Sequence, residues 1–148
     1  RTSWINMIEA YDKLPVKLKK KLDGKKAYFG YKNGKYSTSK FFNEHVNREN
    51  LFPLVMKNDA GLKGLYFPFN QMFGIEGMEQ IEFEDLVKTI KEYVMKPSFV
   101  YHHDWEDGDV VLSEQWLSIH KRWEFEGMPN RILHRIAFDY SNIIATQE

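Results

Sequence analysis

Three strand-like runs near the end of the chain constrain its fold more than any other feature. They are "SFVYHHDW", "DVVLSEQWLSIH" and "RILHRIAFDY", and the turn sequence "EDGD" separates the first two. Runs of this kind, bounded by turn residues, are typical of β-strands. We predict that the first two runs pair as an antiparallel hairpin and that the third forms a further strand.

The residues upstream predict helices and shorter strands. Apolar residues recur at helical spacing from about Ser3 to Leu22, and Pro15 should divide this helical region in two. "AYFGYKN" predicts a short strand, and "LFPLVMKNDAGLKGLYFPF" predicts a hairpin around an Asn-Asp-Ala-Gly turn. "FEDLVKTIKEYVMKP" predicts an amphipathic helix that ends at Pro97. Together these elements indicate a mainly β fold with flanking helices, either a β-sandwich or a jelly roll.

Composition excludes several classes of function. The 148 residues suit one domain, 1–148, and the 21 basic side chains equal the 21 acidic ones, so no bulk charge recruits nucleic acid or a membrane surface. There is no cysteine, and no apolar run approaches the roughly 20 residues of a membrane span. We therefore expect a cytoplasmic protein that binds neither a membrane nor nucleic acid. The composition leaves open whether it forms a homo-oligomer.

Two arginines in the third run raise the question of a binding site. Alternation places Arg131 and Arg135 on one face of the predicted strand and His134 on the other, apolar face. The arginine face is either the solvent face or the mouth of a barrel that binds an anion such as a carboxylate. The periodicity alone leaves both interpretations open. It predicts that His134 is a core residue.

The spacing of these arginines from an upstream histidine resembles a known family. "YHHDWEDGDVVLSEQWLSIHKRW" followed by "RILHRI" is similar to the C-terminal part of the taurine dioxygenase (TauD/TfdA) family of Fe(II)/2-oxoglutarate-dependent oxygenases. The matching features are a tryptophan, a Gly-Asp turn, a histidine, and arginines eleven and fifteen residues after it. In this chain they are Trp105, Gly108-Asp109, His120, Arg131 and Arg135.

The resemblance implies a fold, a chemistry and a set of roles. The fold would be a double-stranded β-helix (jelly roll, cupin-like), incomplete at its N-terminus. His120 would be the distal ligand of a facial iron triad, Arg131 and Thr2 would hold the far carboxylate of 2-oxoglutarate, and Arg135 would reach an anionic substrate group or support the cosubstrate pocket. The implied enzyme is an Fe(II)- and 2-oxoglutarate-dependent dioxygenase. It would use O₂ to oxidise a small anionic organic substrate, with hydroxylation as the expected reaction, and would release succinate and CO₂.

The sequence departs from the family pattern in two places. Ser113, Glu114 and Gln115 stand where the family usually has Trp-Asp-Asn. The proximal His-x-Asp/Glu motif, which supplies two iron ligands, is not in the chain, and we expect it before Arg1.

Other histidines are weaker metal candidates. If the predicted hairpin forms, His102 in the tract His102-His103-Asp104 lies about 23 Å from His120, too far to share a metal. We therefore interpret this tract as strand residues, and His45 as a surface residue.

Two alternatives remain for the function. The chain could be a degenerate, non-catalytic jelly-roll module that binds a small dicarboxylate. It could also be a metal-free structural domain of an assembly, in which case Arg131 and Arg135 should be exposed and unpaired.

Overall fold

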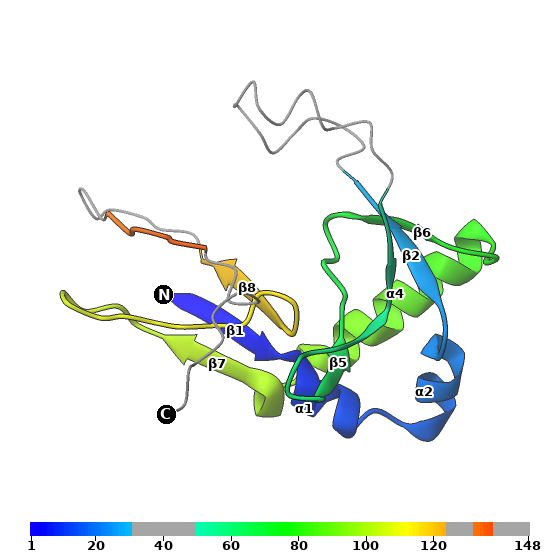
Figure 1. Cartoon of the computed structure of the whole chain (residues 1–148), viewed down its shortest axis with the longest axis horizontal. Coiled ribbons are helices and arrows are strands. Elements are labelled where there is room, and N and C mark those ends of the chain that lie inside the picture. Colours follow the sequence, from blue (N-terminus) through cyan, green and yellow to red (C-terminus); the bar gives the residue numbers. More distant parts are fainter. Residues whose placement is uncertain (31–49, 124–131, 138–148) are drawn as a thin grey trace, which may run out of the picture.

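The computed structural model of this chain describes residues 1–30, 50–123 and 132–137. In chain order, its helices and strands are β1 (Thr2–Asn6), α1 (Met7–Asp12), α2 (Val16–Leu22), β2 (Lys26–Phe29), β3 (Asn50–Pro53), β4 (Val55–Lys57), β5 (Lys63–Leu65), β6 (Met72–Ile75), α4 (Gln80–Val94), η1 (Pro97–Phe99), β7 (Val100–His103) and β8 (Ser118–Arg122). Figure 1 shows β7, β1 and β8 side by side at one end of the molecule and β2 with β6 at the other, with α1 and α4 between them.

The chain begins with a strand rather than with the helix that the apolar spacing predicted from Ser3. Thr2, Trp4 and Ile5 belong to residue types that favour strands, and β1 pairs with a neighbour along each edge. The Asn6 side chain then accepts hydrogen bonds from the backbone N–H groups of Ile8 and Glu9, both at 3.1 Å. This N-cap starts α1 only at Met7.

The predicted break at Pro15 is confirmed. α1 ends at Asp12 and α2 begins at Val16, directly after the proline. Gly24, with a φ of +66°, follows α2 in the left-handed conformation that favours glycine. The helical region therefore has the predicted interruption and end, and only its start was placed wrongly.

The predicted hairpin between the first two C-terminal runs is wrong. β7 and β8 do not pair with each other, because β1 lies between them and pairs antiparallel with both. The "EDGD" turn does form: Asp109 accepts a hydrogen bond from the backbone N–H of Glu106 at 2.8 Å, and Gly108 has a φ of +94°. Beyond it the chain follows an irregular path until Ser118.

The two other sheets agree better with the sequence. The hairpin around the Asn-Asp-Ala-Gly turn is confirmed as β4 paired antiparallel with β5. The strand predicted in "AYFGYKN" is confirmed as β2, which lies between β3 and β6. Each pairing in these sheets is antiparallel, as expected for a mainly β fold of this class.

The predicted amphipathic helix is α4, which ends at Val94, ahead of Pro97. Its buried side chains join the main hydrophobic core and are Phe83, Leu86, Ile90 and Val94. The core also takes residues from β1, α1 and β5, so α4 packs against the same core as the sheet that begins the chain. Among the described residues, the helices are all too short or too polar to cross a membrane.

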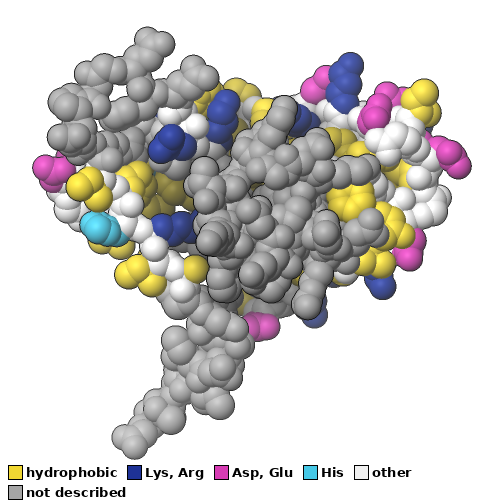
Figure 2. Space-filling view, turned by 90° about the horizontal axis from the view of Figure 1, so that it is seen from above, with side chains coloured by type: hydrophobic (Ala, Val, Ile, Leu, Met, Phe, Trp, Pro, Cys, Tyr) yellow, Lys and Arg dark blue, Asp and Glu magenta, His cyan; other side chains and the backbone are white. Residues whose placement is uncertain are grey.

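The third C-terminal run does not behave as predicted over its described part. Residues 132–137 form no regular strand, and His134 is exposed rather than part of the core. Ile132 and Ile136 are 75% and 84% exposed. Figure 2 shows exposed hydrophobic side chains beside Lys and Arg side chains on one face of the molecule. Within residues 132–137, these apolar side chains therefore do not define a buried strand face.

Gly64 in β5 supports the start of the strand that carries His120. A Cβ atom at Gly64 would lie 2.8 Å from Leu117 Cδ2 and 3.3 Å from Ile8 Cγ1 and Ile8 N. Leu117 is buried, precedes β8, and its carbonyl accepts a hydrogen bond from the Met7 N–H at 3.1 Å. Close packing at β5 therefore positions the entry to β8.

Gly64→Ala is expected to lower the free energy of unfolding by about 1–3 kcal/mol, because the added methyl group overpacks this contact. Urea denaturation measures the change. Gly74→Ala is the matched control, since its Cβ would meet only Tyr28 Cδ2 at an ordinary 3.5 Å. Equal stability losses in the two variants would contradict the packing argument.

Candidate functional site

The sheet β7-β1-β8 has two distinct faces because side chains alternate along each strand. The register pairs Thr2 with His103 and Arg122, and Trp4 with Tyr101 and His120. We call the face that carries His120 the histidine face. Its residues are Thr2, Trp4, Asn6, Tyr101, His103, Ser118, His120 and Arg122. The opposite face carries Ser3, Ile5, Val100, His102, Ile119 and Lys121.

His120 lies on β8, next to an aromatic wall and a guanidinium group. Its ring centroid is 6.4 Å from that of Trp4, the central aromatic residue of β1. Partial burial lowers the pKa of His120, and the nearby positive charge of Arg135 lowers it further. Both effects favour the neutral imidazole, which is the form that binds a metal ion.

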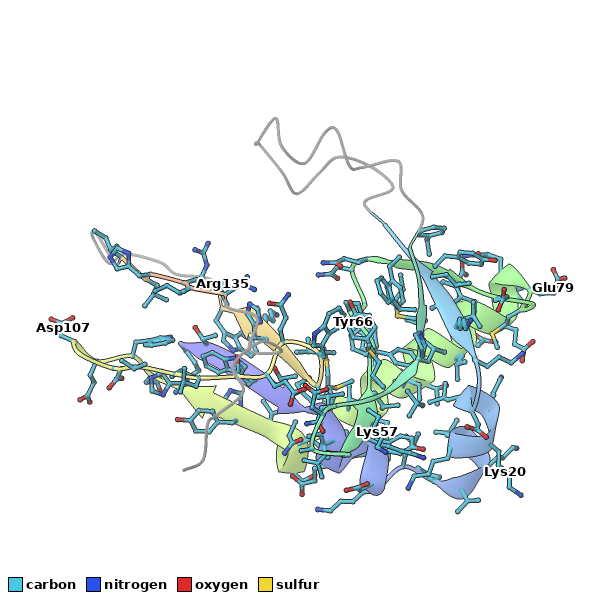
Figure 3. All side chains as sticks on the ribbon, in the orientation of Figure 1. Lys20, Lys57, Tyr66, Glu79, Asp107 and Arg135 are labelled. Carbon is cyan, nitrogen blue, oxygen red and sulfur yellow. The ribbon has the colours of Figure 1, made fainter. Side chains whose placement is uncertain are left out.

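Arg135 contacts the segment that leads into β8, the strand that carries His120. It belongs to the segment 132–137, which lies beside β8, and is labelled in Figure 3. Its Nη2 donates a 3.1 Å hydrogen bond to Gln115 Oε1. Arg131 lies outside the described residues. The structure thus brings Arg135 to the segment that precedes β8, and the position of Arg131 stays a prediction from the sequence.

The two residues that replace the family's Asp-Asn also take defined positions. Glu114 Oε2 accepts a 3.0 Å hydrogen bond from Asn58 Nδ2, which ties the segment before β8 to the β4–β5 hairpin. Gln115 holds Arg135. Acid and amide groups are therefore used for local hydrogen bonding here.

Thr2 is a buried residue of the histidine face. It is only 6% exposed, and its Oγ1 accepts a 2.9 Å hydrogen bond from Trp105 Nε1. Because Thr2 pairs with Arg122, two residues beyond His120, Thr2 and His120 are diagonal neighbours about 7–8 Å apart. A small ligand could thus contact both side chains at once.

A hydrogen-bonded network around His103 was not foreseen from the sequence. Tyr101 Oη and His103 Nδ1 are 3.0 Å apart, and His103 Nε2 is 3.0 Å from Asp109 Oδ2. Trp105 contacts the His103 ring edge to face, with centroids 4.5 Å apart. The "HHDWEDGD" tract holds all but the tyrosine, yet only the observed turn shows that Asp109 folds back onto His103.

The tract His102-His103-Asp104 does not form a metal site with His120, although the reason differs from the predicted one. His102 and His120 pair with the neighbouring residues Ser3 and Trp4 of β1, so their backbones are about 10 Å apart rather than about 23 Å. His102 lies on the opposite face, where its Nδ1 is 2.6 Å from Ser3 Oγ. Asp104 forms two hydrogen bonds with Arg1, of 2.9 and 2.7 Å, and these lower the pKa of its carboxyl group.

The side chains that could bind a metal ion show how much of an iron centre the described residues could supply. His120 supplies one neutral, accessible imidazole, a ligand type that suits iron. No group of three His, Asp or Glu side chains at ligating positions occurs within residues 1–30, 50–123 and 132–137. These residues therefore fit one ligand of an iron centre and do not complete the centre.

The structure consists mainly of antiparallel sheets with few helices, and the solved structures on which it superposes have a jelly-roll fold of the cupin-like class. Within that class the chain belongs to the family described as Taurine catabolism dioxygenase TauD, TfdA family, which matches over residues 1–137. The resemblance seen in the sequence and the predicted jelly-roll fold are thereby confirmed.

Two relatives from bacteria illustrate the family. The alpha-ketoglutarate-dependent 2,4-dichlorophenoxyacetate dioxygenase of Burkholderia sp. (strain RASC) is 25% identical over 138 residues, which cover 90% of this chain and 46% of the relative. The (S)-phenoxypropionate/alpha-ketoglutarate-dioxygenase of Sphingobium herbicidovorans is 28% identical, over 94% of this chain and 53% of the relative. The chain spans about half the length of these curated relatives.

Solved structures show the same fold. A taurine dioxygenase from Burkholderia xenovorans superposes with a TM-score of 0.68 at 25% identity, covering 80% of this chain and 39% of that structure. AAD-2, solved in complex with Mn(II) and N-oxalylglycine, gives a TM-score of 0.70 at 22% identity over 83% of this chain and 47% of that structure.

Proposed function

We propose that this chain carries the distal iron ligand and the cosubstrate-binding residues of an Fe(II)- and 2-oxoglutarate-dependent dioxygenase. The observation that supports this most is the placement of His120 and Thr2 as diagonal neighbours on one sheet face, with Arg135 beside the histidine. Family membership over residues 1–137 supports it independently. The relatives named above are both dioxygenases that depend on alpha-ketoglutarate.

Each proposed role follows from the chemistry of its side chain. His120 would bind iron as a neutral imidazole. Arg131 would pair with the far carboxylate of 2-oxoglutarate through its planar guanidinium fork, and Thr2 would donate a hydrogen bond to the same carboxylate. Arg135 would attract an anionic substrate group to the side of the site that Gln115 borders. Bound iron and 2-oxoglutarate would supply the oxidising power, using O₂ and releasing succinate and CO₂.

The proposed substrate is a small anionic organic molecule that is oxidised, in the first instance by hydroxylation. Two relatives are named for aryloxy carboxylates, 2,4-dichlorophenoxyacetate and (S)-phenoxypropionate, and these are the first compounds to test. Two further inferences from the sequence remain predictions: that residues 1–148 form one domain and that the protein is cytoplasmic.

One observation favours a second candidate function. The described residues contain no set of three metal ligands. Thr2 and the arginines could bind a small dicarboxylate without a metal ion, so a binding module without turnover would use the same side chains. The two functions differ only in whether the remaining iron ligands come from outside the described residues.

Anaerobic titration of Fe(II) in the presence of 2-oxoglutarate tests the proposal. We expect a weak visible charge-transfer band, because the cosubstrate chelates the metal in such sites. A band that appears with Fe(II) and 2-oxoglutarate together, and not with either alone, supports the dioxygenase. Binding of 2-oxoglutarate by calorimetry without any band supports the dicarboxylate module. Absence of both band and binding contradicts both functions.

A further inference from the structure

Two neighbouring hydroxyl groups on β1 each accept a hydrogen bond from a tryptophan, one on each face of the sheet. Trp105 Nε1 donates to Thr2 Oγ1 at 2.9 Å on the histidine face. Trp123 Nε1 donates to Ser3 Oγ at 2.6 Å on the opposite face. Thr2 and Ser3 are 6% and 5% exposed, so the two residues are buried to a similar degree.

The two hydroxyls differ in where their own hydrogen can go. An indole N–H is a donor only, so each hydroxyl oxygen must act as the acceptor and keeps its hydrogen for a second bond. Ser3 lies 2.6 Å from His102 Nδ1, which can accept that hydrogen. Within the described part of the chain, the Thr2 hydroxyl accepts this one side-chain hydrogen bond from Trp105 and donates none. A buried donor without an acceptor is costly, which indicates that Thr2 is arranged to donate to a ligand.

We propose that Trp105 is a positioning residue for 2-oxoglutarate binding. By occupying one side of Thr2 Oγ1, the indole N–H turns the Thr2 hydroxyl hydrogen toward the ligand carboxylate on the histidine face. Trp105 acts through Thr2 and need not touch the ligand. This inference rests on the proposed function, because it takes 2-oxoglutarate as the ligand that accepts from Thr2.

The surroundings of Trp105 suit a positioning role. Its ring lies edge to face with His103 at 4.5 Å and 6.1 Å from Trp4, measured between centroids. His103 is itself held by Tyr101 and Asp109. A ring fixed on these sides cannot easily turn its N–H away, so Thr2 receives its hydrogen bond from a constant direction.

Trp105→Phe tests the hydrogen bond, because it keeps an aromatic ring and removes the N–H donor. Calorimetric titration of the Fe(II)-loaded protein with 2-oxoglutarate under anaerobic conditions should show binding weakened by about three- to tenfold, the range expected for the loss of one hydrogen bond. The matched control is Trp123→Phe, which removes the equivalent indole bond to Ser3 on the opposite face. We expect it to leave the 2-oxoglutarate affinity unchanged.

A double-mutant cycle with Thr2→Val separates positioning from general structural support. If Trp105 acts through Thr2, Trp105→Phe should weaken 2-oxoglutarate binding no further in the Thr2→Val background. Additive losses would overturn the proposal, because they would show that Trp105 acts independently of Thr2. The proposal would also be overturned if Trp105→Phe left the 2-oxoglutarate affinity unchanged while Thr2→Val lowered it. In both cases the proposed function would still stand.

Nitrogen-15 NMR of the unaltered protein keeps the proposal testable even if Trp105→Phe does not fold. The chain has four tryptophans, so the indole N–H signals are few enough to assign. Addition of 2-oxoglutarate should shift the Trp105 signal and leave that of Trp123 in place. An unmoved Trp105 signal, in protein that calorimetry shows to bind 2-oxoglutarate, overturns the inference. If the protein does not bind 2-oxoglutarate, the proposed function and this inference both fail.

Discussion

Alanine in place of His120 is expected to abolish Fe(II) binding while leaving the fold intact. His120 has a lowered pKa, which favours the metal-binding neutral imidazole, and it is a diagonal neighbour of Thr2 on the histidine face. If His120 is one of three protein ligands, as proposed, its removal would leave too few donors for tight binding of a divalent metal. The visible band of the Fe(II) and 2-oxoglutarate complex should disappear, and the circular dichroism spectrum should not change.

His102→Ala is the matched control for this prediction. His102 lies on the same sheet but on the opposite face. It pairs with Ser3, whereas His120 pairs with the next residue of β1, Trp4. We expect His102→Ala to retain the visible band. Full iron-dependent turnover by the His120→Ala protein would show that the role carried over from the family is wrong.

Arg131→Ala is expected to weaken 2-oxoglutarate binding by about 2–5 kcal/mol, the range for losing one partner of a buried charge pair. The reason is chemical: the far carboxylate of the ligand would keep its charge and lose the guanidinium fork that neutralises it. Calorimetric titration measures the change directly. The prediction rests on the spacing of eleven residues after His120, since Arg131 lies outside the described residues.

Arg131→Lys provides the control. Lysine keeps the positive charge but cannot form two parallel hydrogen bonds to a carboxylate, so its affinity should fall between those of the unaltered protein and the alanine variant. An alanine variant that binds 2-oxoglutarate as tightly as the unaltered protein would place the carboxylate partner elsewhere, with Arg135 the next candidate.

Local signals predicted the elements that depend on few neighbours. Pro15 cannot continue a helix because it lacks an N–H group, and the helical region stops there as expected. The β4–β5 hairpin has a short turn whose residue types alone favour reversal of the chain. The apolar stripe of α4 likewise fixes which side faces the core.

Long-range pairing overrode local signals at the sheet that carries the candidate site. The segment from Ser3 has helical apolar spacing, yet it is a strand because β7 and β8 satisfy its backbone groups along both edges. Because β1 lies between β7 and β8, these two strands do not form the hairpin that the "EDGD" turn had suggested. A turn signal shows where the chain reverses, and does not show which strand becomes its neighbour.

For the candidate site, the sequence by itself determined the identity and spacing of His120, Arg131 and Arg135, since a family pattern is a property of residue order. Only the tertiary structure decided the rest. It placed β1 between β7 and β8, brought Thr2 and His120 onto one face, sent His102 to the other, and joined Trp105 to Thr2. The physical reason is that strand order and register follow from backbone hydrogen bonds between residues more than 90 positions apart, which local residue types cannot specify.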